Sequence, residues 1–317
     1  MANPLVSVII PSYRHERFIR ECIKSVILQS YSPLELLLID DASPDGTLQA
    51  AESLRAECGV RFVRTVMLSK KKRNTAVSCN LGIDMAQGKY VYLIASDDAA
   101  EPNAVQELVQ VLESRPDVVL AVGDCSIMDD ASRRIGWDAD RRGIPLEKAR
   151  FKTFGEYLRL NIPSRRRNEF GSYASLLEGN YIPNGYLMRT DALRAIGGYN
   201  TSVLLEDWYM NLQLAKLGGM VYLPRMLYRY RWHEDNVIKT YGTEETGRKI
   251  YREIYALEEA YCREHGLLSI IRRRHPDSLH SRWHRGRRRV LKAVNHIFYI
   301  NLTKRKFSVF GREFHFL

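Results

Sequence analysis

The sequence predicts an α/β fold, with a mostly parallel sheet covered by helices on both faces. Short apolar runs rich in β-branched residues alternate with amphipathic segments through the first 125 residues. Continuous apolar runs are typical of strands that are buried on both faces. Two of these runs end in paired aspartates, at Asp40-Asp41 and at Asp97-Asp98. Because ligands of such sheets bind beyond the carboxyl ends of the strands, we expect both acidic turns at one binding rim.

The elements of this region follow from apolar periodicity and from turn residues. Val6–Ile10 is an apolar run that Pro11 and Ser12 end, and apolar residues then recur at helical spacing from Phe18 to Ile27. By the same criteria we expect further strands at Leu34–Ile39, Val60–Val66, Tyr90–Ala95 and Val118–Gly123, and helices at Thr47–Glu57, Thr75–Ala86 and Pro102–Ser114.

Periodicity fades after this region and then returns. Asp129–Asn180 contains several arginine clusters, among them Arg165–Arg167, and we expect a long excursion of the lid or binding-loop type. Order resumes with a strand at Tyr186–Arg189, a short helix at Asp191–Ile196 and a helix at Leu205–Leu217.

Composition excludes several protein classes. The 317 residues are 45% apolar and 27% charged, which is ordinary for a globular protein. No apolar run is long enough to span a bilayer, and the first residues carry no basic leader. The five cysteines are scattered without a CxxC pair, which favours free thiols in a reducing, cytoplasmic compartment.

The net charge of +11 belongs to the end of the chain. Residues 270–317 hold thirteen Lys and Arg against two Asp and Glu, and the first 269 residues hold 35 of each sign. Within this basic part, Arg282–Leu302 has apolar residues at helical spacing beside Arg287, Arg288, Arg289 and Lys292. A basic amphipathic helix suits anionic lipid headgroups, so we expect peripheral binding to the inner face of the cell membrane. A helix that packs on the rest of the protein is the alternative. No base-reading motif accompanies the charge, so we expect no nucleic-acid partner.

The acidic turns are the sharpest candidates for chemistry. Adjacent carboxylates repel each other unless a cation lies between them, and Mg²⁺ or Mn²⁺ commonly takes one or two protein carboxylates together with phosphate oxygens. Asp97 and Asp98 are therefore candidate metal ligands. Each acidic turn, taken alone, also has a simpler explanation as a helix cap or a tight turn.

The two turns, in this order, are part of a longer resemblance. The segment VSVIIPSYRHERFIRECIKSVILQSYSPLELLLIDDASPDGT resembles the opening of the family 2 glycosyltransferases, and NLGIDMAQGKYVYLIASDD resembles the block that ends in their metal motif. Ala195–Tyr199 followed by Leu205–Trp208 is similar to the family's acceptor-side block, and Tyr230–His233 matches its YRxH element. The four ordered blocks cover residues 5–236.

The resemblance implies a GT-A fold for residues 1–236, with a nucleotide-binding half at about 1–125 and an acceptor-binding half at about 126–236. Residues 237–317 are then a helical, basic extension. It also implies an inverting transferase of the EC 2.4 class that uses Mn²⁺ or Mg²⁺. The donor is a nucleotide-sugar, with UDP favoured, and the acceptor is a saccharide or a lipid-linked saccharide of surface polysaccharide or lipopolysaccharide assembly.

The resemblance also implies roles for residues on the nucleotide side. Pro11 and Tyr13 line the base pocket, and Asp41 binds the base with Asp40 beside it. Where family members often carry a further N-x-G, this chain has Lys71-Lys72-Arg73-Asn74. Arg73 is therefore a cationic candidate for nucleotide contact.

Further roles concern the metal and the reaction. Asp97 contacts the ribose and the metal, Asp98 is the principal metal ligand, and His233 contacts the metal or the diphosphate. Asp207 is the general base that deprotonates the acceptor hydroxyl, and Glu206 supports it. The two carboxylates also lie where a helix is expected to begin, so capping is the alternative for both.

Four more residues are candidates for the diphosphate or the acceptor. Arg229 and Arg231 suit phosphate oxygens because a guanidinium group matches their geometry. Trp208 is placed to stack on a sugar face, with core packing as the alternative, and Asn184 is a candidate for acceptor recognition.

Two other readings explain part of the pattern. A dinucleotide-dependent oxidoreductase has the same α/β alternation, but Pro11-Ser12-Tyr13 stands where its G-x-G-x-x-G would follow the first strand. A non-catalytic membrane-binding or nucleic-acid-binding protein explains the basic tail and leaves Asp98 and Asp207 dispensable.

Overall fold

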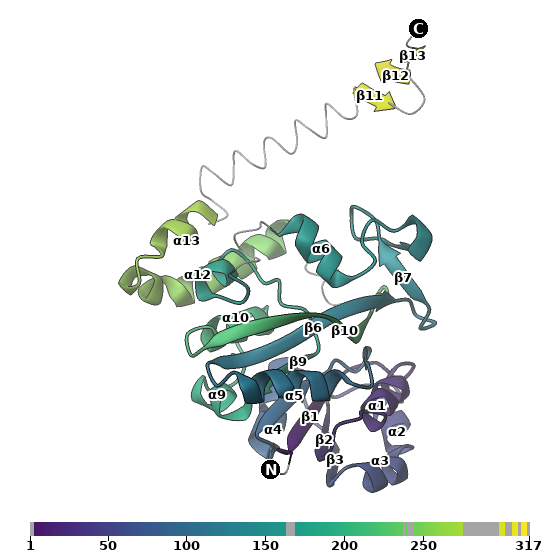
Figure 1. Ribbon diagram of the computed structural model, residues 1–317, viewed down its shortest axis with the longest axis vertical. Helices are drawn as coiled ribbons and strands as arrows, with labels where there is room; N and C mark the ends of the chain where they lie inside the picture. The colour runs from purple at the N-terminus through teal and green to yellow at the C-terminus, as the bar shows by residue number, and fades with distance from the viewer. Residues whose placement is uncertain are drawn as a thin grey trace. The chain divides into compact units, whose positions relative to one another are not determined.

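The computed structural model describes residues 3–162, 169–236, 239 and 244–274, together with the backbone of three short strands between residues 298 and 315. The chain forms two compact units, Met1–Gly242 and Thr243–Leu317. The first unit holds one large sheet with helices packed on it (Figure 1). Within the described residues, no helix combines the length and the apolar composition that crossing a bilayer requires.

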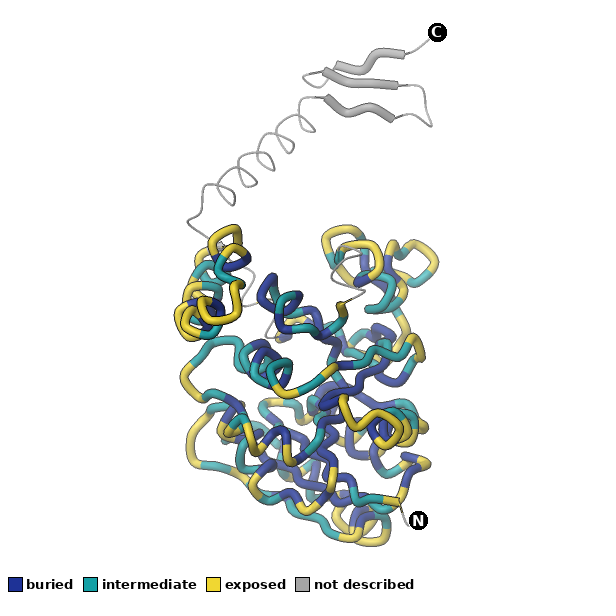
Figure 2. The backbone as a smooth tube through the Cα atoms, turned by 60° about the vertical axis from the view of Figure 1, so that its left-hand side comes forward, coloured by how far each residue is buried: buried dark blue, intermediate teal, exposed yellow. Residues whose placement is uncertain are grey.

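Four parallel strands form the first half of the sheet, in the order β3-β2-β1-β4. Val8 and Leu36 belong to the large apolar core that also contains side chains of α1 and α5. On the opposite face α4 lies so close that a Cβ added to Gly82 would be 2.6 Å from Ile9 Cγ2. Figure 2 shows the buried segments gathered in the interior of this unit. The elements of this half are β1 (Val6–Ser12), α1 (Ile19–Ile27), β2 (Leu34–Asp40), α2 (Thr47–Glu52), α3 (Arg55–Arg61), β3 (Arg64–Ser69), α4 (Thr75–Met85), β4 (Tyr90–Leu93) and α5 (Ala104–Ser114).

The predicted fold class is confirmed, with local corrections. The helix expected at Thr47–Glu57 is broken into α2 and α3, and α3 continues through Val60. The strand expected at Val60–Val66 therefore begins only at Arg64. The prediction took the apolar Val60 as the start of a buried strand, but Val60 is 92% exposed on the helix.

Beyond β4 the sheet continues in the order β9-β6-β10-β5. Strand β9 (Tyr186–Arg189) runs antiparallel to β4 and to β6 (Val118–Met128), whereas β6 and β10 (Gly219–Arg231) are parallel. The sequence did not predict β10, because its register shifts between Leu223 and Met226 and its burial follows no period of two. The other elements are β5 (Ala99–Ala100), α8 (Tyr173–Leu177), α9 (Thr190–Ala195) and α10 (Glu206–Leu214).

The excursion at Asp129–Asn180 is more ordered than its irregular sequence indicated. Strands β7 (Arg134–Trp137) and β8 (Gly143–Pro145) form a hairpin on the end of β6, and α6 (Phe154–Asn161) follows. A small aromatic core holds the hairpin in place; its members are Trp137, Phe151, Phe154, Tyr157, Tyr230 and Trp232. The expected cluster Arg165–Arg167 lies outside the described residues.

The second unit contains helices α12 (Glu244–Glu264) and α13 (Leu268–Arg274), which pack on each other. Its last described elements are three antiparallel strands, β11 (Phe298–Asn301), β12 (Lys306–Val309) and β13 (Arg312–His315). The basic helix expected over Arg282–Leu302 lies largely outside the described residues. The prediction is wrong for the final part of this helix, because Phe298–Asn301 form a strand that pairs with β12.

Candidate active site

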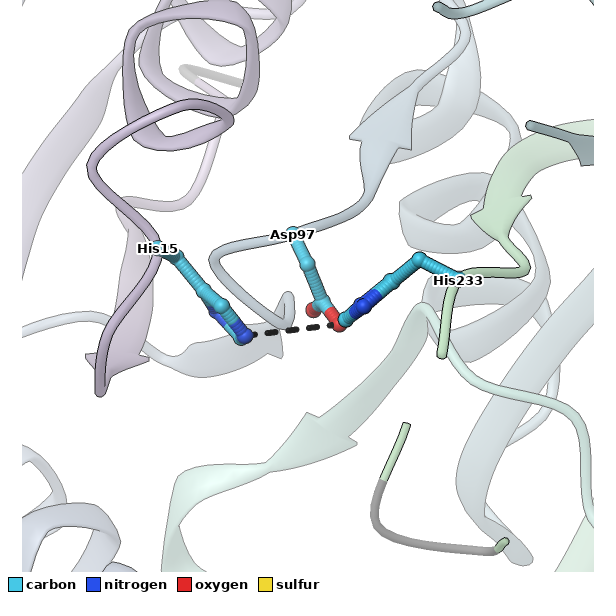
Figure 3. A group of neighbouring side chains, drawn as sticks. All are labelled: His15, Asp97 and His233. Atoms are coloured by element: carbon cyan, nitrogen blue, oxygen red, sulfur yellow. Dashed lines mark hydrogen bonds and ion pairs between the residues drawn. The ribbon is translucent and has the colours of Figure 1, made fainter. Parts of the chain in front are cut away.

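Three side chains from separate strand ends meet at the carboxyl edge of the sheet (Figure 3). His15 follows β1, Asp97 follows β4, and His233 follows β10. His233 Nε2 lies 3.0 Å from Asp97 Oδ2, and His15 Nε2 lies 3.7 Å from the same oxygen. One nitrogen or oxygen atom of each residue lies within 4.8 Å of the others. The structure thus brings Asp97 and His233 together, as expected, and adds His15.

The electrostatics of this cluster favour an ionised Asp97 between two imidazoles. Burial by itself raises the pKa of Asp97, but the hydrogen bond from His233 and the nearby charge of His15 outweigh it and hold the pKa below its usual range. Burial lowers the pKa of His15. An imidazole nitrogen must be unprotonated to bind a metal cation, so a cation bound at this cluster would displace protons from it.

Both carboxylate oxygens of Asp98 are hydrogen-bonded to β10. Its Oδ1 accepts a hydrogen bond from the Arg231 backbone N–H at 2.7 Å, and its Oδ2 accepts one from the Tyr228 hydroxyl at 2.9 Å. Its side chain is fully buried, and burial together with the neighbouring Asp97 raises the pKa of Asp98 well above its usual range. The structure therefore differs from the expectation that Asp98 is the principal metal ligand. Asp97 is the aspartate that meets the two histidines, and the sequence alone did not distinguish it from its neighbour.

Arg231 also differs from its expected place at a diphosphate. The guanidinium group of this fully buried residue donates to the Asp97 carbonyl at 2.7 Å and to Glu21 Oε2 at 2.5 Å, and it lies over the Phe18 ring. Arg229, on the same strand, lies 3.4 Å from Glu21 Oε1 and 3.6 Å from Glu101. Arg231 thus connects β10, helix α1 and the Asp97 loop through its contacts with Glu21 and the Asp97 carbonyl.

The two carboxylates of the first acidic turn, Asp40 and Asp41, have different partners. Asp40 accepts hydrogen bonds from the Ser69 hydroxyl at 2.7 Å and from the Ser43 backbone N–H at 3.0 Å, which fixes the turn. Asp41 Oδ1 lies 2.6 Å from Lys70 Nζ and accepts from the Asn74 N–H. Asp41 Oδ2 is buried and has no hydrogen-bond partner among the residues that the structure describes. A buried carboxylate oxygen without a partner is costly, so this atom is the natural acceptor for a donor on a bound ligand.

Aromatic and cationic groups lie around the same turn. The Arg73 guanidinium lies 4.2 Å from the centre of the Tyr13 ring. Pro11 pairs with Ile39 in the parallel ladder of β1 and β2 and is partly exposed. Tyr13 thus lies at the end of β1 with its ring against Arg73, and its expected place in the base pocket stays a prediction.

Asp207 and Glu206 begin helix α10. Asp207 Oδ2 accepts a hydrogen bond from Asn180 Nδ2 at 2.9 Å, and Oδ1 accepts from the Trp208 backbone N–H at 2.7 Å. Burial raises the pKa of Asp207. Burial, reinforced by the charge of Asp207, raises the pKa of Glu206 to about 7. A carboxylate with a raised pKa is a stronger base.

Asp207 and Asp97 belong to the same rim of the sheet. Asn180, which holds Asp207, precedes β9, and β9 runs antiparallel to β4. The start of β9 therefore lies beside the end of β4, where the Asp97 loop begins. Asn184 lies in this connection, and its carbonyl is 3.7 Å from Cys125 Sγ.

Trp208 is a core residue, which was the alternative to sugar stacking. Its side chain is 1% exposed, and its Nε1 donates to the Leu176 carbonyl at 2.8 Å. This correction follows from burial, because a fully covered ring has no face to offer a sugar. The aromatic side chain instead holds α10 against α8.

The donor set at the sheet edge fits a divalent cation. Adjacent ligands that each lie about 2.1 Å from one cation are about 3.0–3.4 Å apart. Asp97 Oδ2 and His233 Nε2 are joined by a hydrogen bond of 3.0 Å, and the same spacing would let both atoms bind one cation in place of the shared proton; His15 is farther away, at 3.7 Å. A carboxylate oxygen and imidazole nitrogens are ligands for Mn²⁺ and for neighbouring transition metals.

Sequence comparison decides the family. Residues 7–174, more than half of the chain, match the family model described as glycosyl transferase family 2. This chain belongs to glycosyl transferase family 2. The membership confirms the resemblance and makes the protein a transferase, which overturns the oxidoreductase and non-catalytic alternatives.

Several relatives of this family 2 glycosyltransferase share most of its length. An uncharacterized glycosyltransferase of Haemophilus influenzae is 27% identical over 256 residues, covering 79% of this chain and 73% of the relative. Glycosyltransferase GlyG of Streptococcus pneumoniae is 22% identical over 271 residues, covering 85% of each.

Solved structures share the fold of this family 2 glycosyltransferase. S. aureus TarS 1-349 in complex with UDP-GlcNAc superposes with a TM-score of 0.57 at 19% identity, covering 86% of this chain and 73% of that one. Mannosyltransferase PcManGT from Pyrobaculum calidifontis, in complex with GDP-Man and Mn²⁺, gives 0.58 at 16% identity, covering 80% and 64%. The chain covers 46% of the longer TarS structure. These likenesses confirm the GT-A fold.

Sequence reasoning missed three residues of the site in this family 2 glycosyltransferase. His15 stands alone in a polar turn, and nothing in the sequence separates it from an ordinary surface histidine. Lys70 was left out of the cationic segment Lys71–Asn74, although its ammonium group is the one beside Asp41. Asn180 lies at the end of the irregular excursion, and only the three-dimensional structure joins it to Asp207.

Proposed function

We propose that this glycosyltransferase moves a sugar from a nucleoside diphosphate sugar to a hydroxyl of a saccharide acceptor, with UDP as the favoured nucleotide. A single displacement inverts the anomeric carbon. The observation that carries the proposal is the Asp97–His233 pair at the rim where Asp41 and Asp207 also belong. Residues 1–125 form the nucleotide half in this proposal, and residues 126–236 form the acceptor half.

Asp97 and His233 hold a divalent cation, Mn²⁺ or Mg²⁺, in the proposed site. A cation there offsets the charge that develops on the leaving diphosphate. The chain keeps these two ligands in place through Arg231, which binds the Asp97 carbonyl, and through Asn236, whose Oδ1 accepts from the His233 N–H at 2.7 Å.

Asp207 is the proposed general base. It takes the proton of the acceptor hydroxyl as that oxygen attacks the anomeric carbon. Asn180 fixes the orientation of the carboxylate, and burial raises its pKa, so both features favour proton transfer. Glu206 is a supporting carboxylate beside it.

Asp41 and Lys70 read the base in this proposal. The N3–H of uracil lies between two carbonyl groups, so it donates to Asp41 Oδ2 while a neighbouring carbonyl accepts from the Lys70 ammonium. Cytosine has a lone pair at N3 in place of the proton. A site built to receive an N–H rejects an analogue that lacks it, because a buried polar group is left unpaired.

We expect UDP with Mn²⁺ to raise the thermal unfolding midpoint of the protein more than CDP with Mn²⁺ does. The Asp41→Asn variant should lose at least about tenfold in UDP affinity, because an amide in place of the carboxylate weakens the acceptor. Thermal shift and calorimetric titration measure both effects. Ser43→Ala, on the same turn, is the matched control, because the Ser43 hydroxyl accepts from the Arg14 backbone N–H. Equal responses to UDP and CDP would contradict the assigned base contact.

The proposal also names the class of acceptor and the place in the cell where the enzyme works. Similar proteins include a chondroitin synthase of Escherichia coli and a putative teichuronic acid biosynthesis glycosyltransferase of Bacillus subtilis, which match over 37% and 36% of this chain. We propose a lipid-linked or glycan acceptor of surface polysaccharide assembly. The basic residues of 270–317 then hold the enzyme at the anionic cytoplasmic surface of the membrane.

Vesicle sedimentation tests the membrane part. Replacing Arg287, Arg288 and Arg289 with glutamine should weaken binding to vesicles of anionic lipid by about a hundredfold, since each basic residue near such a surface contributes about 1 kcal/mol. The matched control makes the same charge change at Arg165–Arg167. If both triple variants sediment as the wild type does, the basic end of the chain has no role in membrane binding.

A further inference from the structure

His15 is the member of the edge cluster for which the proposed reaction gives no role. It lies on the loop between β1 and α1, at 3.7 Å from the Asp97 oxygen that His233 also contacts. Its ring meets the His233 ring edge-on, with 5.8 Å between the ring centres. Two imidazoles and one carboxylate therefore converge from three separate strand ends (Figure 3).

Several contacts hold His15 in this position. Its Nδ1 lies 2.7 Å from Ser96 Oγ, and its backbone N–H donates to Thr47 Oγ1 at 2.9 Å. When Nδ1 donates to Ser96, the lone pair of Nε2 is directed toward Asp97. Metal-binding histidines are commonly oriented by a hydrogen bond at the second ring nitrogen. The contact with Ser96, the residue before Asp97, links the two candidate ligands directly.

We propose that His15 is a third protein ligand, so that this chain binds one transition-metal cation before any nucleotide is present. The inference rests on the proposed function, because it places the cation in the proposed diphosphate site. One carboxylate and one imidazole are a weak pair that depends on phosphate oxygens to complete the shell. A third ligand from the chain removes part of that dependence.

The kind of ligand atoms in this cluster also determines which metal the protein binds. Mg²⁺ prefers oxygen ligands and keeps several waters, whereas imidazole nitrogen suits Mn²⁺, Co²⁺ and Zn²⁺. With two nitrogen donors against one oxygen donor, the nucleotide-free protein selects transition metals over Mg²⁺. His15 is thus a residue that determines both the order of binding and the metal.

Direct metal binding to the full chain tests the proposal without measuring transfer. Mn²⁺ is titrated into the nucleotide-free protein and followed by the loss of the free-ion electron paramagnetic resonance signal, and Co²⁺ is followed by its visible absorption bands. The wild type should bind one ion per chain, and an excess of Mg²⁺ should not displace it. His15→Ala should weaken nucleotide-free binding by at least about tenfold, the effect of about 1.4 kcal/mol. His15→Asn, whose side-chain amide can take the place of Nδ1 at Ser96 but ends short of the Nε2 position, should do the same if the alanine variant does not fold.

His265→Ala is the matched control, because it removes an exposed histidine of the second unit. It should bind metal as the wild type does. Equal metal affinity in the wild type and both His15 variants would overturn the third ligand, and so would binding that occurs only after UDP is added. In either case a metal bound together with UDP leaves the proposed function intact. Absence of binding even with UDP, in the wild type, would remove both.

Discussion

Replacing Asp207 with asparagine is expected to lower kcat by about 10²–10⁴-fold, the usual contribution of a positioned general base. Asparagine keeps the shape of the side chain and an oxygen that accepts from the Trp208 N–H. It cannot take a proton from the acceptor hydroxyl. The release of UDP from a UDP-sugar measures the loss, and it requires no knowledge of the acceptor because water serves in its place.

The affinity for UDP separates this loss from general damage to the site. The Asp207→Asn variant should bind UDP as the wild type does, because Asp41 and Asp97 are unchanged. Glu206→Gln is the paired variant at the adjacent position, and we expect a smaller loss. The pKa of Glu206 is raised to about 7, so in the wild type this carboxylate becomes charged as the pH rises through neutrality. The pH profile of Glu206→Gln should therefore lack the change near pH 7 that this ionisation causes. Wild-type turnover in Asp207→Asn would rule out this residue as the base.

The sequence was sufficient for the fold because its strands are local apolar runs. β1, β2, β4 and the start of β6 were predicted to within a few residues, since burial on both faces leaves a continuous apolar segment. β10 was missed because a strand with register shifts and mixed burial has no such pattern. The break between α2 and α3 was missed because apolar spacing continues across it.

The site could be predicted only where the residues at one strand end form a recognisable motif. The paired aspartates identified the rim, but which of them meets the histidines depends on partners more than 100 residues away. Tyr228 and the Arg231 backbone take both oxygens of Asp98, and His233 takes Asp97. No spacing rule contains that information, because it arises when β5 and β6 pair with β10. The partners of Arg231, the Asp97 carbonyl and Glu21, are also far away in the sequence, so its burial could not be predicted.

A pair of substitutions decides between the adjacent aspartates. Asp97→Asn should lower UDP release by about 10²–10³-fold, the typical loss when one group that stabilises developing charge is removed. It should also lower the unfolding midpoint somewhat, because the folded protein favours the ionised carboxylate beside His233, so UDP release is measured on the folded protein. Asp98→Asn should keep most of the activity, since the oxygens of Asp98 accept from the Arg231 N–H and the Tyr228 hydroxyl and burial disfavours a charge at that position.

Asp98→Ala completes the comparison and concerns stability. It leaves the Arg231 N–H and the Tyr228 hydroxyl without their acceptor in a fully buried site, which costs about 2–4 kcal/mol. Denaturant unfolding measures that cost, and UDP release by the remaining folded protein measures activity. If Asp98 were the metal ligand, its asparagine variant would be inactive and fully stable, and Asp97→Asn would be the active one. The order of the two activities therefore identifies the carboxylate that faces the diphosphate.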